Sequence, residues 1–391
     1  MMVKSVNIGV TPDYYIPTEM FVRDDILAEM GSIMRKYGSR AVLITTAQDF
    51  LIFQDVVEKI SSVLNGSGIG CIVFDELPLY PNTEYIDSAS YFAKKTKCDM
   101  VIGFGGIESI NAAKAISLLI NNYVFCEEIF ETSPPYPPVN LITVPSYPLF
   151  GFEVLPMLYL TEIHEMTKKV YSQANLFPRA TIVDPKIALA IDEETTANTA
   201  VSSLAISTES VISKRNNGLI NTLALRAIDL TFKNLPIAYK DPKNSGARLN
   251  LAAASIMSGI AFSVAELSVS LAVSLAISSR MNLPVESAMG VILPHIMEYN
   301  LTASPGKYVQ MSKVMDEDVK DITVIEAAIK AVEGVRKMEI DVDIPQRLSQ
   351  FDIQKTDLSR IAEIAITYPF LEQAPRPLTK NEIETILIAA F

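Results

Sequence analysis

The chain has 391 residues, enough for two domains of ordinary size, and its composition excludes several classes of protein. A net charge of −12 with scattered lysines argues against nucleic acid or an anionic membrane as a partner, because both are bound by concentrated lysine and arginine. Three widely separated cysteines are too few for a disulfide framework or a thiolate metal cluster, and they fit the reducing cytoplasm, where we expect the protein to reside.

The first half of the sequence alternates strands and helices at the spacing of a doubly wound parallel sheet. Short apolar runs predict edge strands within 1–24, buried strands at 41–46 and 140–144, and further strands at 69–74, 100–104, 168–171 and 180–183. Helices are predicted at 24–37, 50–64, 83–96 and 108–120. This α/β domain is expected to end near residue 185.

Beyond residue 185 the pattern changes to long helices without a convincing strand, which predicts an all-α C-terminal domain. The helices are expected at 193–213, 217–235, 245–279, 284–299, 322–337, 358–368 and 379–390. Residues 251–277 contain one charged residue and are long enough to span a membrane. Their serines and the lack of a basic flank favour a central helix, buried on every face, in a soluble domain.

A glycine pair, Gly105-Gly106, lies between a predicted strand and a predicted helix. Such a turn lets a phosphate approach the backbone and rest on the helix N-terminus, where free N–H groups and the helix dipole favour an anion. Two glycines at this position also serve close packing of strand and helix, so the pair alone leaves nucleotide binding open.

The sequence resembles the iron-containing (group III) alcohol dehydrogenases, which have a dehydroquinate synthase-like fold. The resemblance covers nearly the whole chain and rests on GGIESINAAK at 105–114, PSYPLFGFEVLP at 145–156, IVDP at 182–185 and LPHIMEYN at 293–300. It implies a Rossmann-like, dinucleotide-binding-type domain over 1–185. Residues 186–391 would correspond to the helical domain that carries the metal and substrate sites in the family.

The resemblance also implies which residues would contact a dinucleotide: Thr46, Ala47, Gly105, Gly106, Ile107, Glu108, Ser109, Ser146, Tyr147, Phe150 and Lys168. Several depart from the family pattern. Ile107 replaces a third glycine, and the charge of Glu108 would repel phosphate. Ala47 stands where the family binds the adenosine ribose through an aspartate, which favours NADP over NAD as the cofactor and leaves both open.

The positions that hold the metal in the family are occupied here by Ser202, Ile206, Leu271 and Val285, and a further family histidine is replaced by Leu275. None of these side chains is a ligand for Fe²⁺ or Zn²⁺, so no metal is expected. The aliphatic residues are expected to fill the vacated site as a repacked core.

Only two histidines occur in the chain, so one subunit cannot build a three-histidine site. We expect His295 to be a helix-face histidine satisfied by a neighbour and His164 to lie in a solvated loop. Metal binding by His164 together with Glu162 and Glu165 is a further alternative.

Three functions remain open at this stage. The chain could be a pseudoenzyme, retained as a binding or assembly module that forms a homo-dimer or pairs with an intact relative, since the family commonly dimerises through its first domain. It could be an NAD(P)-dependent alcohol dehydrogenase or aldehyde reductase that works without metal, with Ser202, Ser203, Ser207 and Lys168 as candidate donors. A small-molecule site lined by Tyr147, Phe150 and Phe152 is the third.

Overall fold

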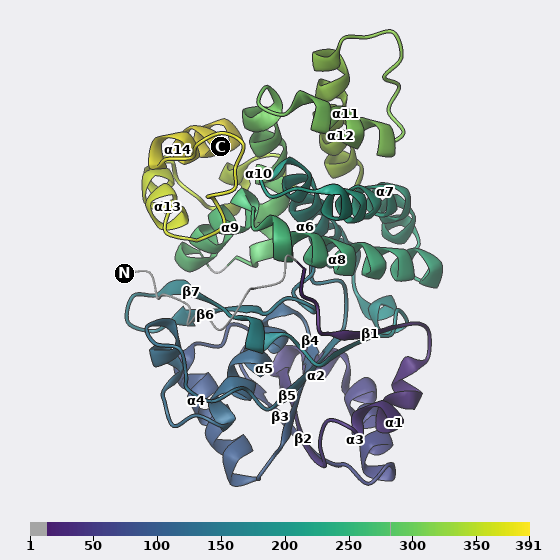
Figure 1. The fold of residues 1–391 in the computed structure, drawn as a ribbon, viewed down its shortest axis with the longest axis vertical. Helices are drawn as coiled ribbons and strands as arrows, with labels where there is room; N and C mark the ends of the chain where they lie inside the picture. Colours follow the sequence, from purple (N-terminus) through teal and green to yellow (C-terminus); the bar gives the residue numbers. More distant parts are fainter. Residues whose placement is uncertain (1–13, 282) are drawn as a thin grey trace. The chain divides into compact units, whose positions relative to one another are not determined.

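A six-stranded parallel sheet organises the first unit of the protein (Figure 1). The computed structural model describes residues 14–281 and 283–391. The chain divides into two units: the first runs up to Tyr147 and from Phe152 to Ala188, and the second comprises Pro148–Gly151 and Leu189–Phe391. The short segment 148–151 therefore leaves the first unit and packs within the second.

The strand order in the sheet is β1-β8-β5-β4-β2-β3, and every neighbouring pair is parallel. The strands are β1 (Glu19–Val22), β2 (Arg40–Thr46), β3 (Gly70–Leu77), β4 (Met100–Gly105), β5 (Asn140–Pro145) and β8 (Ala180–Val183). An antiparallel hairpin of β6 (Met157–Glu162) and β7 (Thr167–Ser172) lies outside this sheet. The predicted parallel sheet is confirmed; the part of the edge-strand prediction on residues 1–13 lies outside the described residues.

Helices alternate with these strands as expected. They are η1 (Ile26–Glu29), α1 (Met30–Met34), α2 (Ala47–Ile52), α3 (Gln54–Gly66), α4 (Thr83–Lys95), α5 (Ile107–Ile120), η2 (Cys126–Phe130), η3 (Ala174–Leu176) and η4 (Ile187–Ala190). Apolar residues of β2, β4, α4 and α5 form one core, which includes Val42, Val101, Ile86 and Ile116. Helix α5 is buried from Ile107 to Leu119, consistent with its alanine- and isoleucine-rich sequence.

The second unit is helical. Its helices are α6 (Glu193–Ile212), α7 (Gly218–Lys240), α8 (Ser245–Ala265), α9 (Val269–Arg280), α10 (Val285–Leu301), α11 (Pro305–Val314), α12 (Val324–Asp341), η5 (Leu348–Phe351), η6 (Lys355–Asp357), α13 (Leu358–Ala365) and α14 (Lys380–Ala390). Helix α6 is buried at every residue from Thr196 to Ile212 and contacts α7, α8, α9 and α10. The centre of this unit is therefore α6.

The prediction of one continuous helix over 245–279 is wrong, because the chain breaks between α8 and α9. Glu266 adopts a left-handed conformation with φ of 49° and ends α8, and the Ser268 side chain caps α9 by accepting from Leu271 N. A buried carboxylate, Glu209 of α6, accepts hydrogen bonds from Val269 N and Ser270 N. These acceptors satisfy the N–H groups that the break leaves free.

The prediction of a helix buried on every face is confirmed for α9, which is buried from Val269 to Ile277. Helix α8 instead has one half-buried stripe, formed by Ala253, Met257 and Ile260. Helix α8 is long and apolar enough to cross a membrane, and 67% of its most apolar window is buried inside the protein. That burial favours its role as a core helix.

Candidate functional site

Three neighbouring strands end at one edge of the parallel sheet and bring predicted cofactor residues together. Because β5, β4 and β2 are adjacent and run in one direction, Ser146, Gly105 and Thr46 meet at this edge. Ser146 N donates to Gly105 O at 3.0 Å, and Thr46 N donates to Ser109 Oγ at 2.9 Å. Ala47 and Gly106 follow directly on two of these residues.

A residue that the sequence reasoning missed, Asp49, lies at the centre of this edge. Its Oδ2 accepts hydrogen bonds from Gly106 N at 3.0 Å, from Ser109 Oγ at 2.6 Å and from Thr46 Oγ1 at 3.1 Å. Burial raises the pKa of the Asp49 carboxyl, and the hydrogen bonds from Ser109, Gly106 and Thr46 oppose that rise. The sequence signal was Thr46-Ala47-Gln48-Asp49, a helix-start pattern with an acid three residues after a threonine.

The space beside each glycine of the pair is filled by a side chain of the same unit. Gly105 has φ of 128°, and a Cβ added to it would lie 2.6 Å from Asp49 Cγ. A Cβ on Gly106 would lie 3.0 Å from Tyr147 Cζ and overlap the phenol oxygen. The glycine pair therefore accommodates Asp49 and Tyr147, which is the packing role left open above.

The first turn of α5 adds a second buried carboxylate. Ile107 is buried, and Glu108 is buried with Lys168 Nζ 3.7 Å from its Oε1. The pKa of Glu108 is raised, chiefly because the carboxyl group is buried. The ammonium of Lys168 opposes this rise, and the nearby carboxylate of Asp49 adds to it. Lys168 also stacks its ammonium over the Tyr159 ring at 5.2 Å. The lysine that the resemblance assigned to the cofactor side is thus paired within the protein.

Two of the three aromatic residues proposed to line a cleft are buried in the protein, and the third, Tyr147, is half-buried. Phe150 and Phe152 are 1% and 0% exposed, and Phe152 packs edge-on against Tyr159 at 5.4 Å. Lys114, fully buried in α5, donates to Phe152 O at 2.6 Å and to Met157 O at 2.7 Å. Burial lowers the pKa of Lys114 to about 7. This buried lysine holds the backbone that follows the 148–151 segment.

Within the second unit, segment 148–151 packs against α8. Gly151 N donates to Ser255 Oγ at 3.0 Å. Gly151 has φ of 95°, and a Cβ on Gly259 would come within 2.6 Å of Gly151 Cα. Two glycines therefore permit a contact between backbones that no larger residue would allow.

The four positions that the resemblance assigns to the metal, 202, 206, 271 and 285, lie on three helices in mutual contact, α6, α9 and α10, and all four side chains are buried. Ile206 and Val285 are 1% exposed and Leu271 is 0% exposed, as is Leu275. Ser202 Oγ is 2.8 Å from Asn198 O and 3.2 Å from Glu286 O, so its hydroxyl bonds to backbone carbonyls. These four side chains do not fit Fe²⁺ or Zn²⁺, because three have no donor atom and the fourth is a neutral hydroxyl engaged with the backbone.

Two buried polar groups lie next in sequence to these aliphatic residues. The buried hydroxyls of Ser207 in α6 and Ser274 in α9 have no hydrogen-bond partner within the described part of the chain. Ser207 directly follows Ile206, and Ser274 directly precedes Leu275. An unsatisfied hydroxyl is destabilising, so these serines are a cost that the aliphatic packing must offset.

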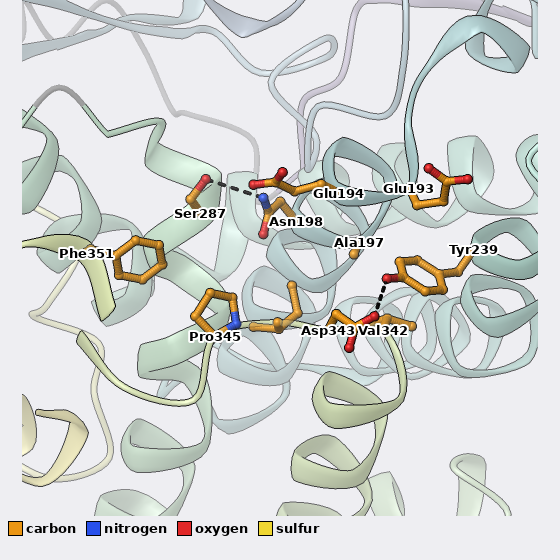
Figure 2. A pocket seen from close by; sticks show the side chains of 11 residues that line it. Glu193, Glu194, Ala197, Asn198, Tyr239, Ser287, Val342, Asp343, Pro345 and Phe351 are labelled. Carbon is orange, nitrogen blue, oxygen red and sulfur yellow. Dashed lines mark hydrogen bonds between the residues drawn. The ribbon is translucent and has the colours of Figure 1, made fainter. Parts of the chain in front are cut away.

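A cavity of about 350 Å³ lies one helical turn from the ligand positions (Figure 2). Asn198, one turn before Ser202, donates to Ser287 Oγ at 3.4 Å on one wall. Tyr239 donates to Asp343 Oδ2 at 2.7 Å on another, which raises the pKa of Tyr239 to about 12. The charged side chains that line it, including Glu193 and Glu194, are all acidic, so the cavity disfavours an anionic ligand.

Neither histidine stands at a position that the resemblance assigns to the metal. His295 of α10 is largely buried with Nδ1 3.8 Å from Glu298 Oε2, and burial lowers its pKa. His164 is 80% exposed in the β6–β7 turn, with Nε2 3.6 Å from Glu127 Oε2. Ligand atoms of Glu127, Glu162 and His164 lie within 4.8 Å of one another, so Glu127 takes the place predicted for Glu165.

This three-residue cluster has a structural role of its own. The carboxylate of Glu162 accepts hydrogen bonds from His164 N and Glu165 N, each at 2.7 Å, and so closes the hairpin turn. The geometry would admit a divalent cation at the surface of the first unit, whereas the family's ligand positions belong to the second unit.

Comparison with known proteins identifies the class to which this fold and these residues belong. Residues 17–185 match the profile described as iron-containing alcohol dehydrogenase, and residues 196–391 match the C-terminal part of the Fe-containing alcohol dehydrogenase family. The chain belongs to the iron-containing alcohol dehydrogenase family, as the sequence motifs predicted.

Individual relatives extend this result along the whole chain. A 1,3-propanediol dehydrogenase of Klebsiella pneumoniae is 26% identical over 386 residues, which cover 97% of this chain and 98% of the relative. The crystal structure of a 1,3-propanediol oxidoreductase superposes with a TM-score of 0.92 at 26% identity, covering 98% of this chain and all of that one. A sulfoacetaldehyde reductase from Bifidobacterium kashiwanohense, solved in complex with NAD+, matches with a TM-score of 0.85 at 21% identity over 98% of this chain and 99% of that one.

Proposed function

We propose that this chain is a family member without metal-dependent dehydrogenase activity, retained in the cytoplasm as a binding or assembly module. One observation carries the proposal: the four family ligand positions are buried, and Ile206, Leu271 and Val285 present only hydrocarbon there. An ion bound at that place would be surrounded by groups that cannot replace its hydration shell.

The absence of a donor set has a direct consequence for catalysis. A divalent ion in such an enzyme polarises the substrate oxygen and stabilises the developing alkoxide by several kcal/mol. A neutral hydroxyl replaces this effect poorly, and Ser202 Oγ already lies at hydrogen-bonding distance from two backbone carbonyls. Lys168, a second candidate donor, is paired with Glu108, and the Ser203 hydroxyl donates to Thr199 O at 3.0 Å. Three of the four candidate donors for a metal-free alcohol oxidation are therefore engaged within the protein, and the fourth, Ser207, offers a single neutral hydroxyl that is buried.

An assembly role agrees with what the chain retains. The family fold persists over 98% of the chain at a TM-score of 0.92 with the propanediol oxidoreductase. A homo-dimer, or a hetero-oligomer with an intact relative, would use this fold without needing the reaction. Co-purification with an intact relative, when both are expressed together, would support the hetero-oligomer.

Turnover assays test the proposal. The purified protein is assayed with 1,3-propanediol and short aldehydes, with NAD(H) and NADP(H), and with added Fe²⁺ or Zn²⁺. The Klebsiella 1,3-propanediol dehydrogenase, purified in parallel, serves as the positive control. We expect no metal-stimulated turnover by this chain, and activity that rises with added metal would refute the proposal. Metal-independent reduction of an aldehyde would instead indicate a metal-free reductase.

A further inference from the structure

The carboxylate of Asp49 occupies the place where this fold holds an anion. The donors around its Oδ2 are a backbone N–H at the start of the 14-residue helix α5, from Gly106, and the hydroxyls of Ser109 and Thr46. A helix N-terminal N–H with nearby hydroxyls is the donor set that binds phosphate oxygens in parallel α/β proteins. Here an internal oxygen atom has taken those donors, and its side chain is 9% exposed.

We propose that Asp49 is a built-in anion that fills the phosphate position of the α5 turn and excludes the diphosphate of a dinucleotide from this chain. The inference deepens the proposed function and rests on it, because a chain without the redox reaction has no use for the cofactor. It makes Asp49 the residue that determines whether this turn accepts a ligand.

Space at the turn supports the proposal. The gap above Gly105 contains the Asp49 carboxylate, and the gap above Gly106 contains the Tyr147 phenol. A diphosphate that approached the glycine backbone would have to displace both side chains. Asp49 would then give up three hydrogen bonds, which is unfavourable for a group buried from water.

Charge at the turn acts in the same direction. Glu108, in the first turn of α5, is a second buried carboxylate near Asp49, and Lys168 is the cation paired with it. A diphosphate would therefore meet two carboxylates and one lysine. Like charges in a buried site repel strongly, so the native turn opposes a ligand that carries at least two negative charges.

The proposal is tested by isothermal titration calorimetry, which measures the affinity of the full-length wild type and variants for inorganic pyrophosphate. Asp49→Ala removes both the charge and the side chain, whereas Asp49→Asn removes the charge and keeps the volume. We expect Asp49→Ala to bind pyrophosphate at least about tenfold more tightly than the wild type, a difference of about 1.4 kcal/mol. Asp49→Asn is expected to bind pyrophosphate more weakly than Asp49→Ala, because its side chain still fills the space although the charge is removed. When NADPH is mixed with each protein, its fluorescence should rise on binding to Asp49→Ala and not with the wild type.

Asp192→Ala is the matched control, since Asp192 caps α6 by accepting from Thr195 N at 2.7 Å and its loss opens nothing at α5. If Asp49→Ala does not fold, as judged by circular dichroism, Asp49→Ser replaces it and keeps a hydroxyl for Thr46 and Ser109. Pyrophosphate binding by the wild type as tight as by the open variant would overturn the inference. So would a folded open variant that does not bind, or equal binding by Asp49→Asn.

Failure of this inference and failure of the proposed function are separable. Metal-stimulated alcohol turnover by the wild type would defeat the proposed function, whatever the pyrophosphate titration gives. Pyrophosphate or NADPH binding by the wild type without turnover would defeat only the assignment of Asp49.

Discussion

Leu271 of α9 is a buried aliphatic residue at a position where the proposal places a lost metal ligand. The resemblance to the family places a metal ligand at this position, and the leucine is 0% exposed within its own unit. Its side chain buries hydrocarbon that contributes about 1.5–3 kcal/mol relative to an exposed position. A residue of this kind contributes to folding stability, whereas a metal ligand would contribute to chemistry.

Shortening this side chain should therefore be costly. We expect Leu271→Ala to lower the free energy of unfolding by about 2–5 kcal/mol, since it removes buried methyl groups and leaves a cavity. Leu219, which is 51% exposed in α7, is the matched control, and Leu219→Ala should change stability by about 0.5 kcal/mol or less. Urea unfolding at constant pH measures both. Equal effects at the two positions would show that Leu271 is not a packing residue.

The contact between Gly151 and Gly259 is a second point at which one atom decides stability. We expect Gly259→Ala to destabilise the protein by about 2 kcal/mol or more, because its Cβ would overlap the backbone of Gly151. The usual gain from replacing a helical glycine by alanine, about 1 kcal/mol, is then lost. Gly306→Ala in α11, where a Cβ meets nothing within 4 Å, should be neutral or stabilising. Thermal unfolding of both variants checks this contrast.

At this scale the candidate site was only partly predictable. The resemblance to the family named Thr46, Gly105 and Ser146 together as cofactor contacts, and the structure brings them together because neighbouring parallel strands end at one edge. Asp49 was missed because it lies just before the predicted helix 50–64, and its hydrogen bond with Gly106 N depends on the tertiary fold. The absence of metal ligands at 202, 206, 271 and 285 stays a prediction from the motifs, whereas the backbone partners of Ser202 were found only in the structure.

At the scale of elements, the break between α8 and α9 depends on Glu209. This buried glutamate accepts from Ser268 Oγ and Ser270 N, each at 3.1 Å, and from Val269 N. Burial raises its pKa to about 7, and the hydrogen bonds from the α9 N-terminus oppose that rise. In the folded protein the group therefore retains its proton up to a higher pH than the ordinary value of 4.5.

The raised pKa of Glu209 predicts a pH dependence of stability. Between pH 4.5 and 7 the folded state binds a proton at Glu209 that the unfolded state has released, so the free energy of unfolding falls as pH rises through this window. The loss amounts to roughly 3 kcal/mol at most, from about 1.4 kcal/mol per pKa unit. Glu209→Gln should remove this contribution, and Glu193→Gln, at an exposed position of the same helix, should not. Urea unfolding at pH 5 and pH 7.5 tests the difference; an unchanged slope in Glu209→Gln would contradict it.

Most helices and strands were predictable from the spacing of apolar residues and from the glycines, prolines and capping residues that end each element. The buried strands β2, β4 and β5 were short runs of β-branched and apolar residues, and each ended at a glycine, a proline or a helix start. The split at Glu266 was not predictable, because the surrounding sequence is apolar on both sides and the acceptor that compensates for it lies 57 residues away at Glu209. Long-range capping of this kind leaves no local signal. Helix α11 was missed because its apolar residues are sparse.

At the scale of the whole molecule, two independent units carry changes that agree with each other. In the first, the glycine turn is filled by Asp49 and Tyr147. In the second, three of the four positions that the resemblance assigns to the metal carry buried aliphatic side chains. The fold nevertheless matches a 1,3-propanediol oxidoreductase along its length. Loss of one shared reaction, as proposed above, would explain both features.

The most direct test of this account is the metal content of the full-length protein, produced in iron- and zinc-supplemented medium and dialysed against a chelator. His164→Ala is analysed beside the wild type, because any ion held by Glu127, Glu162 and His164 at the surface should disappear in this variant. We predict that neither protein retains iron or zinc in proportion to its chains. One ion per chain that persists in His164→Ala would contradict the account.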